Sequence, residues 1–206
     1  MVKSETAPPS TGPQPDVVVS KRPPFIARLR LPLGYVAILA AFFVNDGRFI
    51  WWALGLVSLG SALRMWSAGT LIKTRELTTT GPYAISRNPL YLGTFLAGVG
   101  LTLFVHSAAL FVFFVVTFGL SYTAQISWEE KMLYREHGQP FKDYCKKVGR
   151  YFSPAGFLKD AWRSGFSWVQ MLNNKELAYQ VFWCVMILGL VSQAYLQGNG
   201  ISIVSP

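Results

Sequence analysis

The sequence predicts an all-α, polytopic membrane bundle of about five transmembrane helices with a cytoplasmic cap. Three observations carry the membrane part of this prediction. Of 206 residues, 51% are hydrophobic and only 14% are charged, whereas soluble domains carry about 25% charged residues. The hydrophobic residues gather in long apolar segments. Lys and Arg concentrate in alternate connections between these segments, which is typical of multi-pass membrane proteins.

Five apolar segments follow one another along the chain. We expect helices, because open strands cannot satisfy their backbone hydrogen bonds in lipid. The first segment is short for a span of about 20 residues, so it extends towards Phe25 or packs as a tight hairpin. The fifth carries no charge. The segments cover residues 31–45, 49–72, 89–105, 108–126 and 177–196.

The basic residues predict an orientation. Residues 1–30 carry five Lys or Arg and residues 127–176 carry nine, while the turn at His106 and the stretch after 197 carry none. Because short loops rich in Lys and Arg stay cytoplasmic, the N-terminus lies inside and the C-terminus outside. The net charge of +9 is then directed at anionic membrane lipids, and nucleic acid is not expected as a partner. The compact chain favours a bacterial inner membrane.

The domain boundaries follow from composition. Residues 1–24 are rich in Pro, Ser and Thr and are predicted to be a disordered tail. Residues 25–200 form a single membrane domain, and residues 201–206 form a second tail. The two cysteines and two histidines have no spacing typical of a zinc site or a disulfide framework, so no metal is expected.

The stretch "GPYAISRNPLYLG", residues 81–93, interrupts the apolar pattern. Asn88 followed by Pro89 is typical of a helix start, with Asn88 as N-cap and Pro89 at the first helical position. The positive end of the helix dipole then lies at the cytoplasmic surface, with Arg87 beside it. This combination favours binding of an anionic group such as a carboxylate or a phosphate.

Three further residues of this stretch suit a ligand. Tyr83 and Tyr91 offer aromatic faces that can stack on a base or hold a cation, and Gly93 permits close approach to the helix backbone. An ordinary membrane turn with interfacial tyrosines would give the same pattern. The physical argument alone leaves both readings open.

Arg64 lies inside the second apolar segment. At about 1.5 Å per residue it is roughly 12 Å from the cytoplasmic end of that segment near Ile72. An ionisable residue inside the membrane is a functional-site hypothesis by default. The alternative is that Arg64 extends its head group to the interface.

A second motif, "SWEEKMLYREHGQPFKDYCKKVGRYFSP", covers residues 127–154. Glu129 and Glu130 come where the fourth helix leaves the bilayer, at the interface that holds Arg87. Gly138 predicts the end of that helix, and a further helix is expected to run to about Lys147. A solvated pair of acids on an amphipathic helix is the alternative.

Together the two motifs, in this order and at this separation, resemble the isoprenylcysteine carboxyl methyltransferase family and the related phospholipid methyltransferases. The resemblance covers about residues 64–154. It implies an integral membrane enzyme that uses S-adenosylmethionine, with the cofactor held at the cytoplasmic face and a multi-helix fold. The sequence has no G-x-G-x-x-G, which agrees with a fold other than the soluble dinucleotide-binding type.

The resemblance also implies cofactor-binding residues. The family commonly has Arg-His-Pro where this chain has Arg-Asn-Pro, and Asn88 keeps the capacity to donate and accept hydrogen bonds. By position, the implied cofactor contacts are Arg75, Glu76, Leu77, Thr78, Tyr83, Asn88, Pro89, Leu90, Tyr91 and Glu129.

The substrate side departs further from the family. Eukaryotic prenylcysteine enzymes have a substrate-binding arginine one helical turn before the glutamate, and this position is Gln125 here. A carboxylate substrate would lose its counter-charge at that place. Gln125 and Arg64 are the substrate-binding candidates. Arg87 and Glu130 are candidates for aligning cofactor and acceptor, because a methyl transfer needs alignment more than a protein nucleophile.

The predicted function is transfer of a methyl group from S-adenosylmethionine to a lipophilic acceptor that comes from the bilayer. An isoprenylcysteine-type carboxylate, an ethanolamine phospholipid or a lipophilic thiol are the open acceptor classes. A membrane reductase that uses NADPH and a non-catalytic membrane scaffold are the alternatives from other classes. The reductase would respond to NADPH, and the scaffold would be indifferent to Glu129→Ala.

Overall fold

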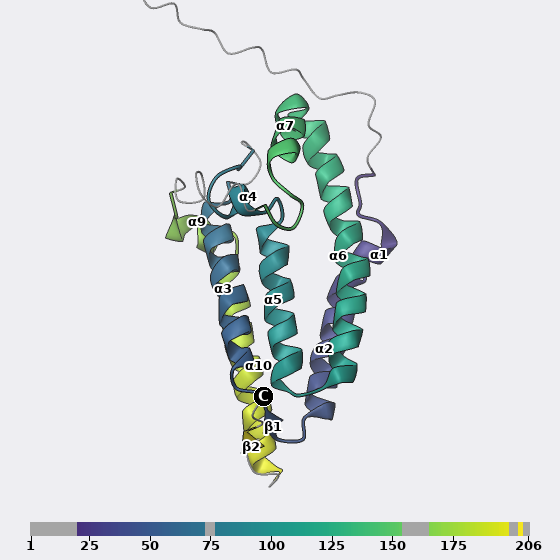
Figure 1. The fold of residues 1–206 in the computed structure, drawn as a ribbon, viewed down its shortest axis with the longest axis vertical. Coiled ribbons are helices and arrows are strands. Elements are labelled where there is room, and N and C mark those ends of the chain that lie inside the picture. The colour runs from purple at the N-terminus through teal and green to yellow at the C-terminus, as the bar shows by residue number, and fades with distance from the viewer. Residues whose placement is uncertain (1–19, 73–76, 154–164, 198–201, 204–206) are drawn as a thin grey trace, which may run out of the picture.

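The computed structural model describes residues 20–72, 77–153, 165–197 and 202–203. The described chain is mostly helical. Its longer helices run along the long axis of the molecule (Figure 1). These helices are α2 (Arg30–Val44), α3 (Ala53–Thr70), α5 (Pro89–Phe104), α6 (Ala108–His137) and α10 (Glu176–Leu196).

Short elements lie at both ends of these helices. The helices α4, α7 and α9 gather at one end, and a small parallel sheet lies at the other, where β1 (Arg48–Phe49) pairs with β2 (Ser202–Ile203) (Figure 1). The short helices are α1 (Phe25–Arg28), α4 (Pro82–Ile85), α7 (Gln139–Lys147) and α9 (Trp168–Asn173).

Each of the five predicted apolar segments overlaps one long helix, and the fourth, 108–126, forms the first part of α6. The first continues towards Phe25 through α1, as one of the two predicted arrangements requires. Two helices, α6 and α10, are long and apolar enough to cross a membrane, while α2 and α5 are apolar but have 15 and 16 residues. The crossing of the membrane by all five helices, and its orientation, stay predictions. The predicted tails 1–24 and 201–206 lie largely outside the described residues.

Local hydrogen bonds define both ends of α6, and its C-terminal end lies at Gly138 as predicted. Ser107 caps its N-terminus, where the Ser107 side chain accepts a hydrogen bond from the backbone N–H of Leu110. The helix ends at Gly138, whose φ of 57° is costly for residues with a Cβ, and the Gly138 N–H donates to the Tyr134 carbonyl. The helix α7 then begins at Gln139 with a proline in its first turn.

The helices α3 and α5 pack backbone against backbone. A Cβ added to Gly60 would lie 2.5 Å from the carbonyl oxygen of Gly93, and a Cβ on Gly100 would lie 2.7 Å from the nitrogen of Val57. Small residues at these positions allow the close approach, as in other membrane helix pairs. The close approach predicted at Gly93 is therefore made by α3.

Candidate active site

The two sequence motifs meet in space. The backbone N–H of Arg87 donates to the carbonyl of Gly149 at 3.1 Å, and the N–H of Ser153 donates to the carbonyl of Ile85 at 2.7 Å. The segment between α4 and α5 is therefore paired along its backbone with the segment that follows α7. This arrangement places the first motif beside the end of the second, and side chains of Arg87 and Tyr91 contact the acids at its start.

Asn88 occupies the position before α5, as predicted, and Pro89 is the first helical residue. Its predicted side-chain cap is wrong, because the Asn88 side chain makes no capping hydrogen bond. The amide nitrogen donates instead to the carbonyl of Arg150 at 3.1 Å, and the Asn88 N–H donates to Ser86 Oγ at 3.0 Å. The Asn88 side chain therefore bonds to the Arg150 carbonyl, which is distant in the sequence, and not to the N-terminus of α5.

Glu130 neutralises two arginines. Its carboxylate pairs with Arg87 at 3.3 Å and accepts hydrogen bonds from Arg150, and only 13% of the Glu130 side chain is exposed. The hydrogen bonds that Arg150 donates to Glu130 raise the pKa of Arg150. The two candidate aligning residues, Arg87 and Glu130, thus belong to one ion-pair cluster. Arg150 had no signal of its own in the sequence, because basic residues are frequent in that region.

Glu129 lies in a chain of hydrogen bonds that joins three helices. Its Oε1 accepts from the Tyr91 hydroxyl at 2.6 Å and from the Gln125 amide at 2.7 Å. The Gln125 Oε1 in turn accepts from Arg30 Nη1 at 2.8 Å. This chain links α2, α6 and α5, and it fixes the Glu129 carboxylate beside Tyr91, as expected for two residues of one site.

Two buried polar atoms near this cluster lack a partner among the described residues. They are the hydroxyl of Tyr83 and Nε of Arg87. Tyr83 is 7% exposed, and burial raises its pKa, so it holds a neutral hydroxyl. Unpaired buried polar groups are rare because each costs about 1–3 kcal/mol. Each of the two atoms could donate a hydrogen bond to a polar ligand.

Tyr83 also connects two short helices. The Tyr144 hydroxyl of α7 donates to the backbone carbonyl of Tyr83 in α4 at 2.6 Å. Tyr144 packs with Phe141 and Val148 in a small apolar cluster, and Leu77 lies against this cluster. The end of the molecule that holds the candidate site is therefore built from α4, α7 and the segment after α7.

Two further residues that were predicted to bind the cofactor, Thr78 and Leu90, make hydrogen bonds within the protein. Thr78 Oγ1 accepts from the N–H of Ile72 at 3.3 Å, and the Leu90 carbonyl accepts from Thr94 at 3.0 Å. Arg75 and Glu76 lie outside the described residues. The cofactor-binding role of all these residues stays a prediction.

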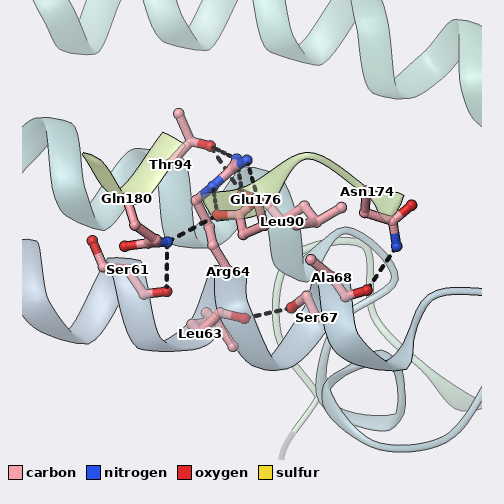
Figure 2. Close-up of polar contacts among 10 residues, drawn as sticks. All are labelled: Ser61, Leu63, Arg64, Ser67, Ala68, Leu90, Thr94, Asn174, Glu176 and Gln180. Carbon is pink, nitrogen blue, oxygen red and sulfur yellow. Dashed lines mark hydrogen bonds and ion pairs between the residues drawn. The ribbon is translucent and has the colours of Figure 1, made fainter. Parts of the chain in front are cut away.

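Arg64 is paired with a residue that sequence reasoning missed. Its Nε and Nη2 donate to the Glu176 carboxylate at 2.9 and 2.8 Å, and Nη1 donates to Thr94 Oγ1 at 2.6 Å (Figure 2). Gln180 supports the same carboxylate, and the guanidinium lies 3.6 Å from the Tyr179 ring centre. All three guanidinium nitrogens of Arg64 are thus occupied. Glu176 had no signal because it directly precedes the uncharged fifth segment.

Two cavities lie among the long helices. The first, of about 300 Å³, is enclosed by α2, α5, α6 and α10 and has Arg30 and Thr94 in its lining. Leu31 and Tyr35, which also line it, are 60% and 62% exposed, so the cavity opens on the side of the helix bundle. The second, of about 290 Å³, is bounded by α5 and α6 and includes Tyr91. Within the described residues, no group of three or more His, Cys, Asp or Glu is placed to hold a metal ion.

Comparison with known proteins gives one family and two relatives. Residues 49–139 match the phospholipid methyltransferase family. The nickel-cobalt-cadmium resistance protein NccN of Alcaligenes xylosoxydans xylosoxydans is 35% identical over 98 residues, which are 47% of this chain and 46% of NccN. The cobalt-zinc-cadmium resistance protein CzcN of Cupriavidus metallidurans is 32% identical over 98 residues, 47% of this chain and 45% of CzcN. The chain thus matches about half the length of each, and no solved structure matches it.

The family match includes both functional parts of the candidate site. It contains the first motif, residues 81–93, and the two adjacent acids Glu129 and Glu130 of the second. The resemblance that the two motifs predict is thus confirmed over residues 49–139, which are less than half of the chain.

Proposed function

We propose that this chain is an integral membrane methyltransferase that moves a methyl group from S-adenosylmethionine to a lipophilic acceptor. One observation carries the proposal. The two motifs are joined by backbone hydrogen bonds, and in the first motif buried polar atoms of Tyr83 and Arg87 have no partner among the described residues. The family match over residues 49–139 supports the same function.

The residues present fit the cofactor. Arg87 keeps Nε as a donor for its carboxylate, because the Arg87–Glu130 pair is made through Nη2. The Tyr83 hydroxyl can donate to the ribose or to the same carboxylate. The Glu129 carboxylate, held by Tyr91 and Gln125, can accept from the ammonium or the ribose. When bound, S-adenosylmethionine supplies a methyl group on a positively charged sulfur.

The protein's own task is alignment and exclusion of water. The first cavity is lined mainly by apolar side chains and lies against the hydrogen-bond chain through Arg30. An acceptor can enter it from the side of the bundle, where Leu31 and Tyr35 are exposed. Holding the acceptor atom in line with the methyl carbon accounts for the expected rate gain, and the reaction needs no covalent intermediate on the protein.

The experiment is label transfer. The purified full-length protein in lipid vesicles is mixed with methyl-labelled S-adenosylmethionine and membranes from its own source. Label in a lipophilic product, lost in Glu129→Ala, supports the function. Glu136→Ala is the matched control, because Glu136 is exposed on α6 two helical turns beyond Glu129. Absence of both transfer and cofactor binding in the unaltered protein would overturn the proposal and leave a scaffold or a reductase.

A further inference from the structure

A third hollow, of about 750 Å³, lies apart from the residues of the candidate site. One wall is formed by the segment 20–24 and by α1, and the other wall belongs to α6. Figure 1 shows α1 beside α6, against which it packs. We call this hollow the basic groove, because no described carboxylate lines it and four basic residues do: Lys21, Arg22, Arg28 and Lys131.

The basic side chains of the groove are not neutralised by the part of the chain that the structure describes. All four are exposed, and none forms an ion pair with a described carboxylate. By contrast, Arg64, Arg87 and Arg150 each pair with a glutamate. Four positive charges that line one hollow repel one another, and an anion between them removes this repulsion. The groove therefore favours an anionic ligand.

Trp128 fixes one wall of the groove to the other. Its indole Nε1 in α6 donates to the backbone carbonyl of Ser20 at 2.9 Å. Pro23 and Pro24 restrict the backbone of the segment that follows, and the buried Ala27 anchors α1. The basic residues of this wall are thus placed before a ligand binds, which lowers the entropy cost of binding it.

An apolar face of α6 leads to the groove. Val116, Leu120, Ser127 and Lys131 follow one another at spacings of four, seven and four residues, which places them on one face of the helix. Val116 and Leu120 are 53% and 64% exposed, and Lys131 is exposed as well. This face is apolar along the helix and becomes polar and basic where it enters the groove. An amphiphile with an anionic head group would contact both parts.

The residues around the groove also suit the level of lipid head groups. Phe25 and Ile26 of α1 are 68% and 52% exposed, next to the exposed basic residues of the same wall. Tryptophan, here Trp128, is enriched where a membrane meets water. Exposed apolar and exposed basic side chains meet in this way where the hydrocarbon of a bilayer gives way to anionic head groups.

We propose that the basic groove binds the head group of an anionic phospholipid from the surrounding bilayer. The phosphate oxygens accept hydrogen bonds from Arg28 on one wall and Lys131 on the other, and an acyl chain lies along Val116 and Leu120. A zwitterionic lipid is disfavoured, because its ammonium would add a fifth cation. The inference rests on the proposed membrane location and is independent of methyl transfer, because no residue of the candidate site lines the groove.

The test compares three probes. The full-length protein in detergent is titrated with dioleoylphosphatidylglycerol, with dioleoylphosphatidylcholine, or with glycerophosphoglycerol, which is the anionic head group without acyl chains. Native mass spectrometry measures the bound fraction. The expected affinity for phosphatidylglycerol is at least about tenfold above that for phosphatidylcholine, and glycerophosphoglycerol binds more weakly than the intact lipid. Equal affinities for the two lipids overturn the proposal. Equal affinities for phosphatidylglycerol and its free head group would indicate a simple anion site and overturn the lipid assignment.

Variants then locate the binding site. Arg28→Gln combined with Lys131→Gln is expected to weaken phosphatidylglycerol binding by about fivefold for each charge removed, the value of one basic residue near an anionic lipid surface, and to leave phosphatidylcholine binding unchanged. Arg135→Gln combined with Lys147→Gln is the matched control, because it removes the same charge from exposed positions outside the groove. An equal loss in both double variants would show that net charge, and not the groove, attracts the lipid.

Protection of a single thiol gives a second measure of the location. Ser127 lines the groove and is half-buried, so Ser127→Cys, with Cys145 and Cys184 replaced by serine, reports on its occupancy. Phosphatidylglycerol is expected to slow labelling of this thiol by a water-soluble reagent, in proportion to the fraction of protein that holds the lipid. Glu136→Cys in the same background is exposed on α6 outside the groove, and its labelling should not change. Protection of neither thiol at saturating lipid overturns the proposal, whereas the proposed methyl transfer is unaffected by that result.

Discussion

Arg64 of α3 and Glu176 of α10 face each other as a two-pronged ion pair, although 112 residues separate them in the sequence. The Glu176 side chain is 3% exposed and that of Arg64 is 16% exposed. The pair lies beside the first cavity, which Thr94 and Tyr179 line on the side of Arg64. It connects α3, α5 and α10 in the part of the molecule where the acceptor is proposed to bind.

Removing one member of this pair should destabilise the protein strongly. Glu176→Gln leaves the buried Arg64 without its counter-charge, and we expect a loss of about 3 kcal/mol or more in the free energy of unfolding. Arg64→Met combined with Glu176→Leu should recover most of that loss. Unfolding curves in one detergent check both. Asp46→Asn is the control, since it breaks an exposed pair with Arg48 and should cost less than about 1 kcal/mol. Equal effects of Glu176→Gln and Asp46→Asn would contradict the expectation.

The close contact of α3 with α5 predicts opposite effects at two glycines. Gly60→Ala would place a Cβ 2.5 Å from the Gly93 carbonyl oxygen, so the helices must separate and the unfolding temperature should fall. Gly55→Ala on the same helix meets open space and should raise it, because alanine favours a helix by up to about 1 kcal/mol. Thermal unfolding of the two single variants in the same detergent gives the comparison. A rise for both would show that the helices do not touch at Gly60.

The helices were predictable because their signals are local. Apolar length set the five helical segments, and Gly138 marked the boundary between α6 and α7. Asn88 shows where local rules end. Its position before α5 is as predicted, but its side chain reaches the Arg150 carbonyl, a group 62 residues away. Helix-capping preferences depend on neighbouring residues only, so they do not predict a hydrogen bond to a carbonyl that is distant in the sequence.

The polar contacts between helices could not be predicted, because their partners are also distant in the sequence. Arg30 was counted among the basic residues of the N-terminal region, and nothing in its neighbourhood indicates Gln125, 95 residues later. Glu176 was read as the residue before an uncharged segment. Which charges meet depends on how the helices are packed, and apolar periodicity does not specify that packing.

The buried tyrosine of α7 predicts alkaline sensitivity. Burial raises the pKa of Tyr144, so the folded protein keeps it protonated where the unfolded chain, with an ordinary value of about 10, ionises. Above that pH the unfolded state binds fewer protons, so stability is full below about pH 10 and falls as pH rises towards the folded pKa. Tyr144→Phe should lower stability at neutral pH, by losing the bond to the Tyr83 carbonyl, and flatten the alkaline fall. Unfolding midpoints across alkaline pH measure this, with the half-exposed Tyr151→Phe as control.

Tyr83→Phe should separate stability from cofactor binding. The Tyr83 hydroxyl is buried and has no partner among the described residues, so its removal should raise the unfolding temperature of the ligand-free protein. If the cofactor takes this hydroxyl as a donor, the same variant should weaken S-adenosylmethionine binding by about tenfold. Thermal unfolding without ligand and calorimetry with it measure the two effects on one sample.

The opposite signs are what make this variant informative. A tyrosine with only a structural role would change the stability of the ligand-free protein and leave the affinity for the cofactor unchanged. Tyr144→Phe is the matched variant, because it removes a neighbouring hydroxyl that is already satisfied by the Tyr83 carbonyl. We expect it to lower the unfolding temperature where Tyr83→Phe raises it. If Tyr83→Phe gains stability and its affinity for S-adenosylmethionine is unchanged, the Tyr83 hydroxyl is not part of the proposed cofactor site. The site would then consist of Arg87 and Glu129.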